Sequence, residues 1–151
     1  MNLKQKLEQD LKTAMLTGDQ TRVLTLRSIK AAVLNEEVAK GLRDQGLSDP
    51  EITAILVKES KKRQESADLY RQGHDEARTN QELAEKAIID SYLPQPLSET
   101  QLREVVDKII QSTGVHDLSM MGNIIGQVKQ QVGASADGAT IARIVKERLT
   151  S

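Results

Sequence analysis

The sequence predicts an all-α protein made of two small domains. Apolar residues recur at three- and four-residue steps along almost the whole chain, the spacing that places side chains on one helical face. Residues typical of helix starts and ends fall between these runs, and no segment shows convincing strand alternation. Two prolines within residues 94–96 interrupt the pattern. We therefore expect an N-terminal domain of about four helices at residues 1–96 and a tail domain of three helices at residues 97–151.

The first two helices have clear boundaries in the sequence. Leucines at positions 3, 7 and 11 form the apolar face of a helix that ends at Gly18. Asp19 can cap the next helix, whose apolar positions run from Val23 to Leu34 before Gly41 closes it. Residues 41–47 are mostly polar or glycine, so we expect a polar loop there.

The next two helices complete the predicted N-terminal domain. Ser48 is followed three residues later by Glu51, which is a capping box, and the helix that it opens ends near Gly73. A fourth helix begins at about Asp75. This helix must stop before Pro94, because proline removes a backbone donor and disfavours helix in the residue before it.

Three further helices are expected after the prolines. Their caps are Ser98, with Gln101 completing a second capping box, then Ser119 and then Asp137. The first of them ends near Gly114, and the second near Gly133. The last carries its apolar residues on one face up to Leu149.

Composition excludes several classes of function. Tyr70 and Tyr92 are the only aromatic residues, so the chain is poorly equipped to stack nucleic-acid bases. The absence of cysteine excludes disulfides, thiolate nucleophiles and cysteine-based zinc sites. The 21 basic and 22 acidic residues nearly cancel, so binding to nucleic acid would depend on a local patch. No apolar run approaches the roughly 18 residues that a membrane span needs, and the chain begins in a charged helical pattern, so we expect a cytoplasmic protein without a membrane partner.

The sequence shows no catalytic, metal or cofactor site. His74 and His116 stand alone in expected loops, without a second ligand at metal-binding spacing. There is no glycine-rich phosphate loop, and nothing suggests an activated serine with an oxyanion hole. Carboxylates alternate with bases at helical spacing, so we interpret pairs such as Glu59 and Arg63 as solvated ion pairs on a helix surface.

Two local features are candidates for binding. Lys58 and Lys62 lie on one helical face and form a small positive strip that could receive a phosphate or an acidic partner; the alternative is a solvated helix face. Gly122 and Gly126 are placed four residues apart inside an expected helix, where each glycine costs about 1 kcal/mol relative to alanine. Something is therefore expected to approach this helix closely. It is either another helix of the same domain, or a nucleic-acid backbone or partner chain.

At these residues the chain resembles the YqeY-like family, part of the GatB/YqeY grouping. The resemblance covers nearly the whole chain. In the first half it rests on Leu26-Arg27, Ala31-Ala32-Val33, Asn35, Glu37-Val38, Lys58-Glu59, Lys62-Arg63, Glu65-Ser66, Tyr70, Tyr92-Leu93-Pro94 and Leu97-Ser98. In the second half it rests on Met121-Gly122, Ile125-Gly126, Ala136-Asp137-Gly138 and Ile144-Val145-Lys146.

The resemblance implies a tail domain like that of the GatB component of the glutamine-dependent tRNA amidotransferase. In that enzyme the tail helps to hold the tRNA, while the ammonia-releasing and kinase-like sites lie on other domains. Neither site has a counterpart here, since the chain has no cysteine to hydrolyse glutamine and no amidase segment with a paired serine and lysine. The resemblance therefore implies a non-catalytic accessory module of a carbon–nitrogen ligase that uses glutamine as amido donor.

Carried over by position, the resemblance implies a contact surface for tRNA or another partner. Its residues are Gly122, Gly126, Lys129, Arg143, Lys146 and Arg148. Family members often have a base after the first glycine and another before the Ala-Asp-Gly segment, where this chain has Asn123 and Ser135, so RNA affinity is expected to be reduced. The alternative is a protein-docking module without RNA contact, which binds amidotransferase subunits or another translation-related assembly through the N-terminal domain. A third hypothesis, an amidase or ligase acting alone, lacks visible machinery.

Overall fold

The computed structural model describes residues 1–114 and 117–150, and within them all regular structure is helical. The predicted all-α class is thereby confirmed. The chain divides into two compact units, the first from Met1 to Leu93 and the second beginning at Pro94. His116, one of the two histidines considered as metal ligands, lies outside the described residues.

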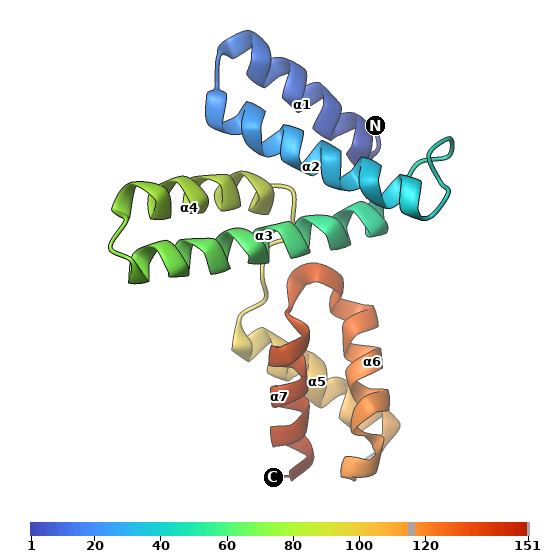
Figure 1. Ribbon diagram of the computed structural model, residues 1–151. Coiled ribbons are helices and arrows are strands. Elements are labelled where there is room, and N and C mark those ends of the chain that lie inside the picture. The colour runs from blue at the N-terminus through green and yellow to red at the C-terminus, as the bar shows by residue number, and fades with distance from the viewer. Residues whose placement is uncertain (115–116, 151) are drawn as a thin grey trace. The chain divides into compact units, whose positions relative to one another are not determined.

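Helices α1 (Leu3–Thr17) and α2 (Gln20–Ala39) form the first pair of the first unit (Figure 1). The Asn2 side chain caps α1 in a capping box with Gln5. Gly18 ends α1 as predicted, with a φ of 75° that a side chain would disfavour. Asp19 accepts a hydrogen bond from the backbone N–H of Arg22 and so caps α2.

Helices α3 (Asp49–Gln72) and α4 (Glu76–Asp90) pack against each other as a helical hairpin (Figure 1). The predicted capping box of Ser48 and Glu51 is present at the start of α3. His74 is exposed in the turn between the helices, at a φ of 58°. The α4 helix ends at Asp90, earlier than Pro94 requires, because the next residues form a turn in which the N–H of Tyr92 donates to the carbonyl of Ile89.

The core of the first unit is aliphatic and draws on all four helices. Its fully buried residues include Ile29 of α2, Ile52 and Leu56 of α3, and Ile89 of α4. Leu47 is also buried, so the expected polar loop over residues 41–47 contributes one residue to the core. The partly buried Leu42 of the same loop also packs against this core, so two leucines hold the loop against the helices.

The second unit contains α5 (Glu99–Thr113), α6 (Met121–Val132) and α7 (Gly138–Thr150), with short 3₁₀ turns at Leu118–Met120 and Gly133–Ser135. The capping box of Ser98 and Gln101 opens α5 as predicted. The prediction that Ser119 caps α6 is wrong. Ser119 lies inside the 3₁₀ turn, where its own N–H donates to the Asp117 side chain, and α6 begins two residues later without a side-chain cap.

A separate aliphatic core holds the second unit together. Its members include Val106 of α5, Ile124 and Val128 of α6, and Ile144 of α7, all fully buried. The N–H of Leu97 donates to the carbonyl of Ser135 at 2.8 Å, which attaches the start of the unit to the turn between α6 and α7. Among the described helices of both units, none is long and apolar enough to span a bilayer.

Candidate functional site

The two glycines of α6 lie on the exposed side of that helix. A Cβ built at Gly122 or Gly126 would meet no heavy atom within 4 Å. Of the two alternatives for these glycines, close packing by another helix of the same domain is therefore contradicted. Because glycine lacks a side chain, the α6 backbone is open to close approach from outside at both positions.

Lys129 shares the face of α6 that carries the glycines, since it lies three residues after Gly126 and seven after Gly122. Its side chain reaches the start of α7, where Cε and Nζ lie 3.4 and 3.5 Å from the position that a Cβ on Gly138 would take. No carboxylate of the described residues forms an ion pair with Lys129. The face is thus formed by bare backbone with one cation at its end.

Arg143 belongs to a network of charges that joins α7 to α5. It forms ion pairs with Glu99 and, at 3.2 Å, with Glu147. Arg103 of α5 lies between the same two carboxylates, at 3.6 Å from Glu99 and 3.4 Å from Glu147. The hydrogen bond from Arg143 to Glu99 is the main cause that raises the pKa of Arg143. Its positive charge is therefore largely offset within the protein.

Arg148 is held in the same way, because its Nε lies 3.1 Å from the Asp107 carboxylate of α5. Lys146 differs: it is exposed on α7, and no described carboxylate pairs with it. Of the four cations that the family resemblance implies, the two arginines thus engage carboxylates, while Lys129 and Lys146 remain available to an external anion.

A neighbouring carboxylate offsets part of the positive charge of the basic strip on α3. Lys58 and Lys62 are both exposed, and the Lys62 ammonium lies 3.3 Å from Glu59. The prediction that Glu59 and Arg63 form a solvated pair is wrong, because their side chains are only 11% and 13% exposed. Arg63 also donates to the Ser28 hydroxyl of α2 at 2.9 Å, so this ion pair fastens α3 to α2.

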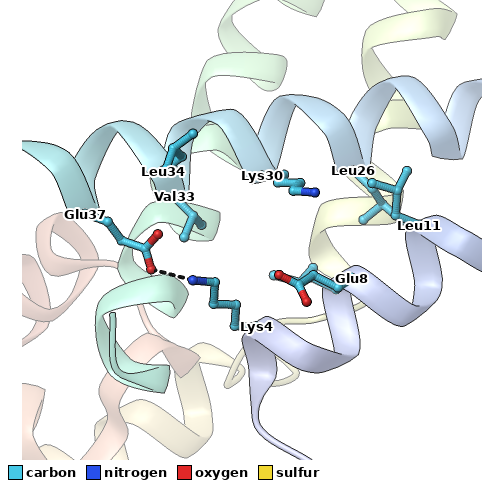
Figure 2. A pocket seen from close by; sticks show the side chains of 9 residues that line it. Lys4, Glu8, Leu11, Leu26, Lys30, Val33, Leu34 and Glu37 are labelled. Atoms are coloured by element: carbon cyan, nitrogen blue, oxygen red, sulfur yellow. Dashed lines mark hydrogen bonds and ion pairs between the residues drawn. The ribbon is translucent and has the colours of Figure 1, made fainter. Parts of the chain in front are cut away.

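A hollow between α1 and α2 was not predicted from the sequence (Figure 2). We call it the α1–α2 hollow; its volume is about 140 Å³. Aliphatic side chains line it, namely Leu7, Leu11, Leu26, Val33 and Leu34. Four charged residues stand around them, Lys4 and Glu8 from α1 and Lys30 and Glu37 from α2.

Glu37 is the buried member of this charged set. Its Oε2 accepts hydrogen bonds from the Lys4 ammonium at 2.9 Å and from the backbone N–H of Leu47 at 3.1 Å. Gly46 lies close to the pair, where a Cβ would be 3.3 Å from the same oxygen. The bond from Lys4 lowers the pKa of Glu37 even though burial opposes the charge. A signal existed in the sequence, because Glu37 lies four residues after Val33 on the apolar face of α2.

Comparison with known proteins gives a family match and a partial relative. A family model described as "Yqey-like protein" matches residues 4–149. The chain is also similar to "Altered inheritance of mitochondria protein 41, mitochondrial" from Eremothecium gossypii, at 33% identity over 87 residues. That stretch covers 58% of this chain and 46% of the relative, so it spans about half the length of that protein.

Proposed function

The chain belongs to the YqeY-like family, and on that premise we propose that it is a non-catalytic accessory module that associates with tRNA through its second unit. The observation that carries this proposal is the exposed glycine face of α6, which ends in Lys129. A phosphate backbone can approach a helix closely where side chains are absent, and lysine supplies a positive charge to it.

The ion pairs of the second unit set the expected strength of this interaction. Arg143 and Arg148 are engaged with carboxylates, so Lys129 and Lys146 are left as the cations for phosphate contact. Two phosphate contacts give a logarithmic salt slope of about −2. The module is therefore expected to bind tRNA weakly by itself and to act beside a partner, such as an amidotransferase, that supplies the carbon–nitrogen ligase chemistry.

Titration of tRNA by fluorescence anisotropy at low and moderate salt tests this function. We expect salt-dependent binding that the double variant Lys129→Ala/Lys146→Ala abolishes. Arg71→Ala/Lys108→Ala, which removes two exposed cations elsewhere, is the matched control and should change binding little. Binding that does not respond to salt, or an unaltered affinity in the double variant, would contradict the proposal.

A second candidate function is protein docking through the first unit, within a translation-related assembly. The α1–α2 hollow and the exposed aliphatic residues of α2 favour it. Pull-down of the full chain from extract, with and without nuclease, separates the two functions. A protein partner that stays bound after RNA is removed favours docking, and its loss on nuclease treatment favours RNA association.

The cytoplasmic location predicted from the sequence belongs to the same proposal. The relative named above carries "mitochondrial" in its name, which concerns that protein. Fractionation of the source cells with organelle markers would decide between the two compartments.

A further inference from the structure

The α1–α2 hollow has the size and lining of a receptor for one apolar side chain. Its volume of about 140 Å³ is close to that of a buried apolar cavity of about 150 Å³ known to take up benzene. A leucine or phenylalanine side chain would fit, whereas a long acyl chain would not. Because the hollow is partly open to solvent, a side chain of a partner could enter it.

Exposed aliphatic residues extend this apolar surface along α2. Leu34, which lines the hollow, is 41% exposed, while Val38 and Leu24 are 58% and 57% exposed. With exposed Ala31 they follow the spacing of a single helical face. The stripe from Leu24 to Val38 is about 21 Å long at 1.5 Å per residue. A face of this length suits an amphipathic helix of several turns, which recognises such grooves through regularly spaced apolar residues.

The charges around this surface indicate the sign of the charge expected on the partner. Lys4 and Glu37 pair with each other and cancel. Lys30 and Glu8 stand on opposite sides of the hollow, and neither forms an ion pair within the described residues (Figure 2).

Two further exposed cations, Lys12 and Arg27, lie on the same two helices as Glu8 and Lys30. Lys12 lies four residues after Glu8 on α1, and Arg27 lies three residues before Lys30 on α2. Three cations against one carboxylate give a net charge of 3 − 1 = +2 beside the apolar surface. The complementary partner surface is therefore acidic as well as apolar.

We propose that the α1–α2 hollow and the adjoining stripe of α2 dock an acidic amphipathic helix of a partner protein. One large apolar side chain of that helix enters the hollow, and its carboxylates lie beside Lys12, Arg27 and Lys30. This inference rests on the docking candidate given above and is independent of RNA association by the second unit. It specifies the chemistry of the partner, not only the existence of one.

A synthetic helical peptide tests the proposal on the full chain. The peptide has leucines along one face and glutamates on the other, and its binding is measured by fluorescence anisotropy. We expect saturable binding that weakens about tenfold when the central leucine is replaced by alanine, and that is lost when the glutamates are replaced by lysines. Equal affinity for the acidic and basic peptides, or no binding with a Kd tighter than about 1 mM, would overturn the proposal.

Variants of the chain locate the binding surface. Leu34→Ala and the double variant Lys12→Ala/Lys30→Ala should each weaken peptide binding about tenfold. All three side chains are exposed, so the thermal midpoint should stay close to that of the parent. The pair Arg71→Ala/Lys108→Ala removes two exposed cations elsewhere and should leave affinity unchanged. Equal weakening by the control pair would show a nonspecific charge effect and defeat the proposal.

Methyl NMR gives a second, independent readout. Peptide addition should shift the methyl signals of Leu7, Leu26 and Val33, which line the hollow. If those signals are unmoved while a nuclease-resistant partner is still captured, the docking candidate stands but its surface lies elsewhere, and the present inference fails. Preferential binding of anionic vesicles or tRNA to these residues would also overturn it.

Discussion

Glu37 joins three parts of the first unit through one buried carboxylate. It projects from α2, accepts from Lys4 of α1, and accepts the N–H of Leu47 at the end of the loop that leads to α3. Its pKa is lowered chiefly by the hydrogen bond from Lys4. A carboxyl whose folded pKa lies below the unfolded value of about 4.3 stabilises the fold above that pH. The contribution is lost as pH falls through the folded pKa.

Replacement of Glu37 by glutamine should therefore have a pH-dependent cost. We expect Glu37→Gln to reduce the free energy of unfolding by about 2 kcal/mol at neutral pH, since the charge-assisted bonds are weakened. The difference from the parent should begin to shrink as pH falls below the unfolded value of about 4.3, and it should vanish below the lowered pKa of the folded carboxyl. Urea denaturation across a pH series measures both effects. Glu8→Gln, on an exposed residue, is the control, and a difference that is constant with pH would refute the expectation.

Tyr92 connects the end of α4 to α1. Its hydroxyl donates to the Asp10 carboxylate, and the Lys6 ammonium lies 5.9 Å from the ring centre. Burial and the bond to Asp10 raise the pKa of Tyr92, so the phenol keeps its proton and remains a donor to Asp10 even in alkaline solution at about pH 10.

Removal of the Tyr92 hydroxyl should lower the stability of the fold. We expect Tyr92→Phe to lower the free energy of unfolding by about 1 kcal/mol, because the Asp10 carboxylate loses a donor while the ring packing remains. Tyr70→Phe is the matched substitution, with its ring kept near Arg78, and should change stability by less than about 0.5 kcal/mol. Equal effects of the two substitutions in chemical denaturation would argue against a role for the Asp10 bond.

At the scale of one element, α6 carries two glycines that its own stability does not require. Both lie inside a helix with open space where a Cβ would be. Alanine at each position should raise the free energy of unfolding by about 1 kcal/mol, because it favours the helix and meets no neighbour. Thermal unfolding of Gly122→Ala and Gly126→Ala measures this gain.

The same two variants separate helix stability from binding. If the glycine face receives an RNA backbone, tRNA affinity should fall in the variants even as their stability rises. Gly138→Ala provides a contrast, since its new Cβ would touch the Lys129 side chain at 3.4 Å within the protein. A stabilised variant that binds tRNA as well as the parent would show that the bare backbone is not used.

Helix starts were predictable where the capping interaction is local. The boxes at Ser48 and Ser98 involve residues three apart, so their sequence signature determines their geometry. The prediction for Ser119 is wrong because the side chain of Asp117, two residues earlier, accepts the Ser119 N–H within a 3₁₀ turn. Capping residues close together in sequence compete for the same helix start, and the sequence does not tell which one forms it.

At the scale of the whole molecule, each compact unit has its own aliphatic core. We therefore expect a fragment beginning at Pro94 to fold by itself, with helical circular dichroism and a cooperative thermal transition. Ile124→Ala in this fragment should abolish the transition, because deletion of a fully buried isoleucine side chain costs about 2 to 5 kcal/mol and small domains are marginally stable. A fragment without helical signal would contradict this expectation.

The sequence by itself determined the all-α class, the family and most helix boundaries. These features follow from interactions within a few residues and from motifs that can be read in order along the chain. The candidate contact residues of the second unit, such as Lys129 and Lys146, were also predicted from the family motifs, and their role in binding is the function proposed above. Leu34 shows the limit: its helical spacing is that of a core residue, yet it is 41% exposed beside a hollow.

Only the tertiary structure decided which charges are available and where the surface is concave. Arg143 is engaged by Glu99, 44 residues away in sequence, and Arg63 by Ser28, 35 residues away. Such contacts depend on how helices pack, which a one-dimensional pattern of apolar residues leaves open. The α1–α2 hollow has the same origin, because an unfilled space between two helices is a property of their packing and not of either helix alone.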